Sequence, residues 1–378
     1  MHYTGTIWRP PYEAASLLVE VTAGCTHHEC KFCTLYNDLP FKFRMSPMED
    51  IECDLQEVKR AVKGLRSGRT DRVFLTGANP FVLSYDKLAA IAELVRKYLP
   101  SVKSIGSFAR ITDVTPKSDE ELAKLRALGY DGLTIGIETG DDEALRFMNK
   151  GYTSADIIEQ CQRLDAADIH YSFFYLVSIS GAGRGEIGAK LTADLCNQLH
   201  PTLIGANMIT IYPDSELYAE IQRGNWQEEG ELEKYKEVRT LIENLQIPTT
   251  FAAMGASNAY QFHGQLPRDR QKLLAFLDGI IENVSEEELK KYPHFSNTKP
   301  GDFRFVDVDG DGVMDLDKDR TIVGNYMPDF TYGFGGKVWF KGFDLDFNFQ
   351  GVYGNEILNL NRRYIDNLEG NTNGTTIA

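Results

Sequence analysis

Short apolar segments alternate with amphipathic segments over about residues 15–212. Each amphipathic segment has apolar residues at helical spacing, as in the stretch 48–65, where they fall at Ile51, Leu55 and Val58. Apolar strands that alternate with helices predict a parallel sheet covered by helices. Six strands are expected, at 16–22, 72–77, 104–109, 132–138, 170–179 and 203–212. The predicted fold class is α/β, a partial (β/α)6 TIM-like barrel with its chemistry at the C-terminal strand ends.

The pattern changes twice after this core. Long helices are predicted at 230–245 and 267–283, which gives a helical C-terminal extension of the core. Beyond about residue 292 helical periodicity ends, and KVWFKGFDLDFNFQGVYG alternates with period two across a tight turn at 341–342. This alternation predicts an amphipathic β-hairpin. The expected domains are a β/α barrel core, its helical extension and a short β-rich tail, at 1–212, 213–292 and 293–378.

Composition narrows the class of protein. The 378 residues carry a net charge of −15 and a pI of about 5.0, which argues against nucleic acid or an anionic membrane as the main partner. The start of the chain has no secretory signal pattern, and no apolar run is long enough for a membrane helix. The expected compartment is therefore the cytoplasm. Thiols stay reduced there, so clustered cysteines indicate metal binding or catalysis.

Three of the six cysteines lie in VTAGCTHHECKFCTLYND, directly after the first predicted strand. Cys25, Cys30 and Cys33 have the spacing C-x4-C-x2-C, and three thiolates hold three irons of a [4Fe–4S] cluster and leave the fourth iron open. An open iron binds a small molecule through an amine and a carboxylate, as S-adenosylmethionine (SAM) offers. Two alternatives remain open on spacing alone. One is a zinc site completed by a loop histidine, and the other is a closed cluster completed by Cys53.

The loop with Phe32 directly before Cys33, and the later segment GLTIGIETGDDEALRFMNKGYT, resemble the radical SAM superfamily. Within it, they resemble the coproporphyrinogen-oxidase-like and elongator-like branch. The resemblance covers about residues 15–290. The first cysteine gap departs from the family's commonest spacing, C-x3-C-x2-C, by one extra residue. This departure loosens the branch assignment more than it affects cluster binding.

The resemblance implies roles for particular residues. The three loop cysteines would ligate the cluster, and Phe32 would lie against the adenine of SAM. The backbone after the second strand would receive the methionine amino group, Glu138 would hydrogen-bond the ribose, and Arg110 would meet the carboxylate. Each also has a plainer interpretation as a turn residue, a helix N-terminal anion or a surface cation. The cofactor-binding residues implied are Phe32, Thr76, Gly77, Ala78, Asn79, Arg110, Glu138, Ser178 and Gly181.

The activity that the resemblance implies is a radical reaction. A reduced cluster would cleave SAM to methionine and a 5′-deoxyadenosyl radical, which abstracts hydrogen from substrate. This implies the [4Fe–4S] cluster and SAM as cofactors, a low-potential electron donor such as flavodoxin or ferredoxin, and a small-molecule or unknown substrate. The sequence identifies no catalytic residue and no substrate. The alternatives are a non-catalytic metal-binding module and a transport fragment based on the tail.

The tail contains an acidic loop in DVDGDGVMDLDKD. The loop carries aspartates at Asp307, Asp309, Asp311 and Asp315, with Gly312 between the last two. This pattern matches the first part of a calcium loop. A lysine stands at the closing position where a glutamate is expected. The loop is therefore interpreted either as a calcium site or as a solvated acidic turn.

From about Lys299 to Thr376 the tail resembles the barrel region of TonB-linked outer-membrane nutrient receptors. The segments that carry this resemblance are PGDFRFVDVDGDG, DRTIVGNYMPDFTYGF and KGFDLDFNFQGVYGNEI. Apolar residues at alternate positions suit the lipid-facing side of a membrane strand. The abrupt change after KKYP leads to the hypothesis that the chain joins two unrelated reading frames.

Overall fold

The computed structural model describes residues 1–4, 7–62, 71–255, 257–290 and 330–353. The chain divides into two compact units, Met1–Asn297 and Thr298–Ala378. The division of the first unit into a barrel core and a helical extension stays a prediction. Among the described residues, no helix is long and apolar enough to cross a membrane.

One mixed sheet organises the first unit. Its strands follow the order β1-β4-β5-β6-β7-β8-β9-β10, and all neighbours pair in parallel except β9 and β10, which are antiparallel. The strands are β1 (Leu17–Glu20), β4 (Arg72–Thr76), β5 (Ser104–Ala109), β6 (Tyr130–Glu138), β7 (Tyr171–Val177), β8 (Leu203–Met208), β9 (Thr249–Ala253) and β10 (Phe262–Leu266).

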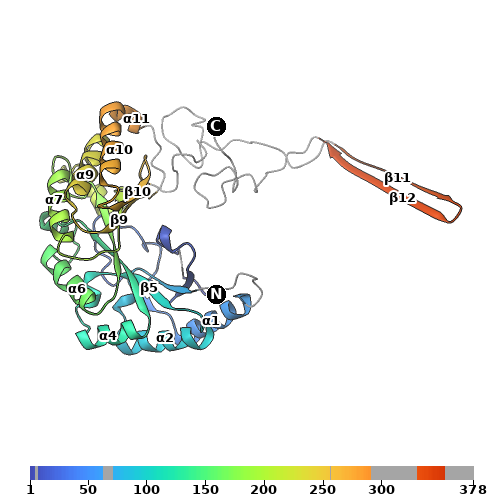
Figure 1. Cartoon of the computed structure of the whole chain (residues 1–378), viewed down its shortest axis with the longest axis horizontal. Coiled ribbons are helices and arrows are strands. Elements are labelled where there is room, and N and C mark those ends of the chain that lie inside the picture. The colour runs from blue at the N-terminus through green and yellow to red at the C-terminus, as the bar shows by residue number, and fades with distance from the viewer. Residues whose placement is uncertain (5–6, 63–70, 256, 291–329, 354–378) are drawn as a thin grey trace. The chain divides into compact units, whose positions relative to one another are not determined.

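Helices cover the outer face of this curved sheet (Figure 1). They bury apolar faces on the sheet, which gives a continuous core in this unit. The elements are η1 (Pro11–Glu13), α1 (Met48–Val62), η2 (Pro80–Val82), α2 (Tyr85–Tyr98), α3 (Ile111–Val114), α4 (Asp119–Ala127), α5 (Asp142–Phe147), α6 (Ser154–Ala166), α7 (Gly185–Cys196), α8 (Glu216–Gln222), α9 (Glu231–Asn244), α10 (Arg270–Asn283) and α11 (Glu286–Lys290).

Local signals explain where several of these elements begin and end. Ser118 accepts a hydrogen bond from the Glu121 backbone N–H at 3.1 Å, and the Glu121 carboxylate accepts one from the Ser118 N–H at 2.8 Å. This reciprocal capping box starts α4 as the sequence predicts. Gly129, with φ of +91°, follows the end of α4 in the left-handed conformation that favours glycine.

The α/β fold with a partial parallel barrel is confirmed, and the six predicted strands are present as β1 and β4 to β8. The structure adds two strands, β9 and β10, within the segment expected to be a helical extension. Their sequences, TTFAA and FHGQL, are short and poor in large apolar residues. Pairing of β9 with β8 and of β10 with β9 stabilises them more than their own apolar pattern does, and tertiary context commonly overrides propensity in this way.

The described part of the second unit is a long hairpin of β11 (Phe330–Phe340) and β12 (Phe343–Tyr353). Lys341 and Gly342 form its turn with φ of +48° and +86°, as the predicted tight turn requires. The apolar residues of both strands are exposed, with Phe343 81% and Trp339 75% accessible. The acidic loop with Asp307, Asp309, Asp311 and Asp315 lies outside the described residues.

Candidate active site

The base of the cysteine loop is held by backbone hydrogen bonds. At its base β2 (Thr22–Gly24) pairs with β3 (Phe43–Met45), and the Cys25 N–H donates to the Lys42 carbonyl at 2.9 Å. Gly24 is required here, because a Cβ would lie 2.2 Å from the Lys42 oxygen and φ is +79°. The loop therefore leaves the sheet through a closed antiparallel ladder.

The tip of the loop is fixed between two helices. The Lys31 N–H donates to the Met148 carbonyl after α5 at 3.1 Å, and the Lys31 carbonyl accepts from the Leu217 N–H in α8 at 2.8 Å. The Lys31 ammonium also pairs with Glu220 at 2.9 Å and lies 4.2 Å from the centre of the Phe147 ring. These contacts place the middle cysteine, Cys30, between elements that are distant in sequence.

The first cysteine gap contains one residue in the left-handed conformation. His28 has φ of +49°, which is uncommon for a residue with a side chain. Its Nε2 lies 2.9 Å from Asn37 Oδ1, and His27 Nε2 lies 2.6 Å from the Asn149 carbonyl. Each loop histidine therefore has one ring nitrogen engaged with a protein partner.

The thiols of the loop are partly buried and lie beside two cations. Burial raises the pKa of Cys33 to about 11 and also raises that of Cys30, whereas Lys150 and Arg110 favour the thiolate of Cys30. A cysteine binds a metal as its thiolate, so these cations favour the form that an iron would bind. Among the described residues, no group of three or more histidine, cysteine, aspartate or glutamate side chains is arranged to hold a single metal ion.

Glu138 ends β6 and faces the loop. It adopts a φ of +63° at an irregular register of β6 with β7, a strained geometry that turns its side chain out of the strand alternation. Lys150 Nζ donates to Glu138 Oε1 at 2.9 Å, and both side chains are nearly buried. Burial alone would lower the pKa of Lys150, but Glu138 outweighs it and raises that pKa well above its ordinary value. Lys150 therefore stays charged beside Glu138.

A second polar network connects the loop to β4 and β5. Asn79 Nδ2 donates to Thr26 Oγ1 at 2.8 Å and to the Asp113 carboxylate at 3.0 Å. The Arg110 N–H donates to the same carboxylate at 2.8 Å, and the Arg110 side chain donates to the Lys150 carbonyl. Burial raises the pKa of Asp113 to about 6. This network fixes Asn79 and Arg110 against the loop.

The turn after β4 lies close to β2. Gly77 has φ of +133°, and a Cβ there would lie 2.0 Å from Thr22 Oγ1. Thr76 is buried and Ala78 is half-buried at the same turn. The structure thus brings Thr76 and Gly77 against the strand that enters the cysteine loop.

The segment after β7 rests on two buried glutamates. Ser178, with φ of +73°, donates its N–H to Glu237 at 2.7 Å and accepts at Oγ from the Glu229 N–H at 3.0 Å. Gly181 follows with φ of +83° and donates to the Ser178 carbonyl at 2.9 Å. Burial and the neighbouring Glu237 raise the pKa of Glu229 well above its ordinary value.

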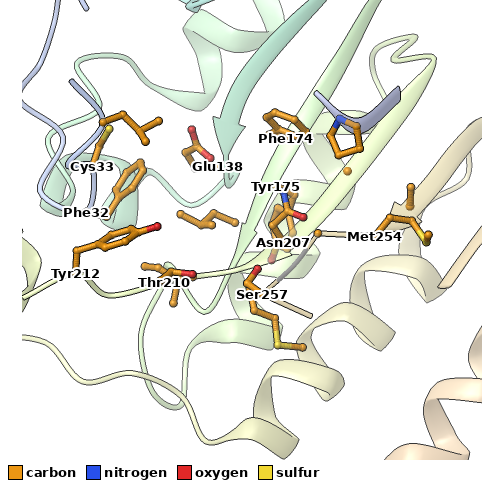
Figure 2. Close-up of a pocket in the computed structure, with 18 of the residues that line it drawn as sticks. Phe32, Cys33, Glu138, Phe174, Tyr175, Asn207, Thr210, Tyr212, Met254 and Ser257 are labelled. Atoms are coloured by element: carbon orange, nitrogen blue, oxygen red, sulfur yellow. The ribbon is translucent and has the colours of Figure 1, made fainter. Parts of the chain in front are cut away.

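A cavity of about 570 Å³ opens inside the sheet (Figure 2). Figure 2 shows Cys33 and Phe32 at one end, Phe174 and Met254 at the other, and Glu138 between them. Its volume is typical of a small-molecule site. The lining residues are Pro11, Tyr12, Phe32, Cys33, Thr34, Leu35, Glu138, Phe174, Tyr175, Leu176, Leu203, Gly205, Asn207, Met208, Ile209, Thr210, Tyr212, Ala252, Met254, Gly255 and Ser257.

The structure brings some sequence-predicted residues into this cavity and leaves others around it. Phe32, Cys33 and Glu138 line the cavity. The other predicted cofactor residues lie outside its lining, namely Cys25, Cys30, Thr76, Gly77, Ala78, Asn79, Arg110, Ser178 and Gly181. Sequence reasoning missed Lys150 and assigned no role to Asp113. Lys150 stood within the segment that carries the family resemblance, and that was the available signal.

A mostly parallel β/α sheet with a cysteine loop after its first strand and a cavity inside it is the architecture of a partial β/α barrel. Residues 19–186 match the Radical SAM superfamily. The chain therefore carries a radical SAM domain over this region, which includes the cysteine loop and the strands from β4 to β7.

The chain also has weak structural likenesses to solved proteins. The chain is similar to methylornithine synthase at 17% identity, with a TM-score of 0.42 over 62% of this chain and 64% of that chain. It is similar to coproporphyrinogen III oxidase from Escherichia coli at 16% identity, with a TM-score of 0.38 over 52% of this chain and 44% of the other. The chain covers 30% of a cobalamin-dependent SAM radical enzyme at 19% identity and a TM-score of 0.41.

Short matches to TonB-dependent receptors are also found among known proteins. A TonB-dependent receptor of Formosa agariphila is 43% identical over 63 residues, and a second is 39% identical over 83 residues. These matches cover 17% and 21% of this chain. The chain spans only 6% and 8% of the length of these receptors. The comparisons give no support to calcium in the acidic loop.

Proposed function

We propose that this protein binds a [4Fe–4S] cluster through Cys25, Cys30 and Cys33 and cleaves SAM reductively. The single observation that carries the proposal is that Cys33, Phe32 and Glu138 line one cavity behind a cysteine loop of the radical SAM superfamily. When bound, the cluster would supply one electron for the reductive cleavage of SAM to methionine and 5′-deoxyadenosine, with a hydrogen atom taken from the substrate. A low-potential flavodoxin or ferredoxin would supply that electron.

The residues around the loop fit this cluster and this cofactor. Three thiols lie on one anchored loop beside Lys150 and Arg110, which favour thiolate ligands. Glu138 offers the carboxylate for the ribose hydroxyls, and Phe32 offers an apolar ring for the adenine in the same cavity. Both side chains support the roles that the family resemblance implies.

The remaining cofactor roles are part of the same proposal. Arg110, fixed by Asp113, lies near the loop where it can meet the SAM carboxylate. The turn 76–79 offers backbone groups to the methionine amino group, and the segment 178–181 offers its backbone to the adenine. The cytoplasm is the proposed compartment, because free thiols of this loop require reducing conditions.

The test is anaerobic iron–sulfur reconstitution of the full chain, followed by an assay of 5′-deoxyadenosine with dithionite. The wild type should hold about four irons per chain and release 5′-deoxyadenosine and methionine in equal amounts. Cys25→Ala, Cys30→Ala and Cys33→Ala should each lose cluster absorbance and cleavage. Cys53→Ala is the matched control, because Cys53 is an exposed cysteine on α1, and it should keep both.

Two outcomes would overturn the proposal. One is a wild-type protein that holds its cluster but releases no 5′-deoxyadenosine under strong reductant. The other is stoichiometric zinc in place of iron, which would support the non-catalytic metal-binding module instead. Loss of the cluster in Cys53→Ala as well would instead support the closed cluster that Cys53 completes.

A further inference from the structure

The cavity has a second end that the cysteine loop does not form. Pro11 and Tyr12 from η1 line it, together with Phe174 from β7 and Met254 after β9. The rings of Tyr12 and Phe174 lie 6.4 Å apart, centre to centre. Figure 2 shows that Phe174 and Met254 lie across the cavity from Cys33.

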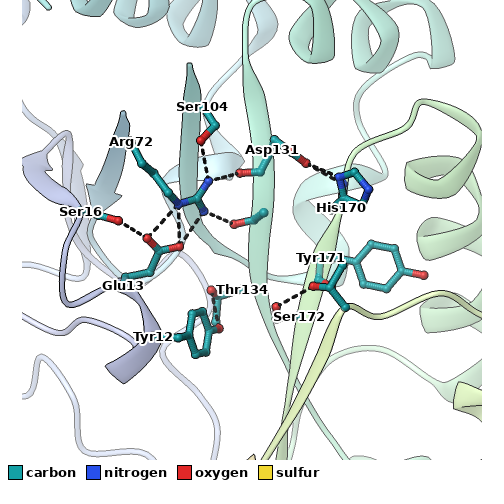
Figure 3. Close-up of polar contacts among 12 residues, drawn as sticks. Tyr12, Glu13, Ser16, Arg72, Ser104, Asp131, Thr134, His170, Tyr171 and Ser172 are labelled. Carbon is teal, nitrogen blue, oxygen red and sulfur yellow. Dashed lines mark hydrogen bonds and ion pairs between the residues drawn. The ribbon is translucent and has the colours of Figure 1, made fainter. Parts of the chain in front are cut away.

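The segment η1 forms the floor of this second end, and it is anchored to strands β4, β5 and β6 of the sheet (Figure 3). Tyr12 Oη lies 2.9 Å from Thr134 Oγ1 in β6. The next residue, Glu13, forms an ion pair with Arg72 at 2.6 Å, and Arg72 Nη1 also donates to Ser104 Oγ at 3.1 Å. Arg72 and Ser104 are the first residues of β4 and β5, so η1 is held at the strand ends opposite the cysteine loop.

The chemistry of this end is apolar and uncharged. Apart from the Tyr12 hydroxyl, its side chains are hydrocarbon, aromatic or thioether groups, contributed by Pro11, Tyr12, Phe174, Leu203, Ala252 and Met254. Burial raises the pKa of Tyr12 to about 12, so its hydroxyl stays neutral at physiological pH. The carboxylate that lines the cavity, Glu138, is already paired with Lys150.

The cavity lining also includes polar side chains, among them Asn207, Thr210 and Ser257. Asn207 in β8 lines the cavity, and within the described residues its side-chain amide makes no recorded hydrogen bond. Gly255 leaves room for it, since a Cβ there would lie 1.9 Å from Asn207 Oδ1. An amide without a protein partner offers both a donor and an acceptor to a ligand.

We propose that the η1 segment forms the floor of a substrate subsite, and that this subsite takes an uncharged aromatic or apolar group with one hydrogen-bonding function facing Asn207. The proposal rests on the proposed function, which assigns the cysteine end of the cavity to SAM and leaves the opposite end for substrate. Although Tyr12 and Met254 are 41% and 39% exposed, the side chains at this end offer a charged group no partner, which favours an uncharged group over a charged one.

The test uses two photoreactive probes that differ in charge. They are 4-[3-(trifluoromethyl)diazirin-3-yl]benzyl alcohol and the corresponding benzoate. The reconstituted full chain is irradiated with each probe in the presence of SAM, and labelled peptides are mapped by mass spectrometry. The alcohol should label the peptides of Tyr12, Phe174 and Met254 about tenfold more than the benzoate does, which corresponds to about 1.4 kcal/mol.

Two variants make the test specific. Met254→Glu introduces a carboxylate at the subsite and should reduce labelling of the Tyr12 peptide by the alcohol about tenfold. Leu191→Glu, an exposed apolar position of α7 outside the cavity, is the matched control and should leave that labelling unchanged. Circular dichroism of both variants establishes that they are folded.

Equal labelling by the two probes would overturn the proposal, and so would labelling of the Tyr12 peptide that Met254→Glu leaves unchanged. Probe labelling does not require SAM cleavage. Charge-selective labelling without 5′-deoxyadenosine would therefore sink the proposed function alone, whereas cleavage without selective labelling would sink the subsite alone.

Discussion

At the scale of single residues, the site depends on buried charges that each have a specific partner. Glu138 and Lys150 pair beside the cysteine loop, and Asp113 orders Asn79 and Arg110. Removal of one partner from such a pair leaves the other as an uncompensated buried charge, which is costly. Substitutions at these positions should therefore affect stability and cofactor binding together.

Lys150→Met should lower the free energy of unfolding by about 3 kcal/mol, because it leaves the Glu138 carboxylate buried without its cation. Under the proposed function, SAM affinity should fall about tenfold, since Glu138 is no longer held in place. Urea denaturation and calorimetric titration of the reconstituted protein with SAM measure both effects. Lys190→Met, an exposed lysine on α7, is the control. Unchanged SAM affinity in Lys150→Met would contradict a positioning role.

The raised pKa of Glu229 predicts that the stability of the folded protein depends on pH. Its pKa is raised in the folded state by burial and by Glu237. The unfolded chain therefore loses this proton from about pH 4.3 upward while the folded chain keeps it. Stability should fall as pH rises from there through neutral pH towards the folded pKa. Glu229→Gln should flatten this fall and be more stable than wild type at pH 9 by about 1–3 kcal/mol.

Thermal unfolding at pH 5, 7 and 9 measures this effect. Glu159→Gln, at an exposed position of α6, should keep the wild-type pH profile. A Glu229→Gln variant with the wild-type slope would show that the raised pKa of Glu229 does not cause this pH dependence.

At the scale of elements, the cavity depends on how η1 is attached to the sheet. The Arg72 guanidinium donates to Glu13, to Ser104 and to the carbonyls of residues 131 and 132. A lysine offers a point charge without this planar arrangement of donors. The attachment of the cavity floor therefore rests largely on one arginine.

Arg72→Lys should destabilise the protein by about 2 kcal/mol, a value reduced for the partial exposure of Arg72. Amide exchange over residues 11–16 should speed up about tenfold, since each 1.4 kcal/mol of local stability corresponds to a factor of ten. Hydrogen exchange with mass spectrometry measures it. Arg268→Lys, in the exposed pair with Asp269, should leave this exchange unchanged. Equal exchange in both variants would mean that Arg72 does not hold the floor.

At the scale of the whole molecule, the two units differ in whether their apolar residues are buried or exposed. The first unit buries its apolar residues in a continuous core. The hairpin of the second exposes apolar residues on the same face, because Val338 pairs with Leu345 and Phe340 with Phe343. Exposed apolar edges of this type promote association between copies.

A chain ended at Asn297 should keep the thermal transition of the first unit and show less aggregation than the full chain. Light scattering and calorimetry at equal concentration measure this. Full-length Trp339→Lys with Phe343→Lys should reduce aggregation similarly, since both side chains are largely exposed. Loss of the thermal transition on truncation would show that the tail is part of the first unit's fold.

The joining of two reading frames near residues 290–298 remains our hypothesis for the origin of the tail. It predicts that genomic DNA from an independent isolate does not encode both units in one frame. Sequencing across the codons of this region is the measurement. A continuous open reading frame there would contradict the hypothesis.

The sequence by itself determined the order of strands and helices in the core and the hairpin of the tail. Those features follow from local apolar periodicity, capping residues such as Ser118, and turn residues such as Gly342. It also determined the cysteine loop, since ligand chemistry depends on residue type and spacing. Short strands such as β9 escaped prediction, because their stability comes from pairing with a neighbour distant in sequence.

Only the tertiary structure decided which of these residues meet. Lys150 lies 12 positions beyond Glu138 and pairs with it across a helix, and Asn79 joins Thr26 and Asp113 from separate β/α units. Tyr12 reaches the cavity from a segment that precedes the first strand. Such contacts depend on how the sheet curves and how its connections pack, and local sequence pattern carries no record of either.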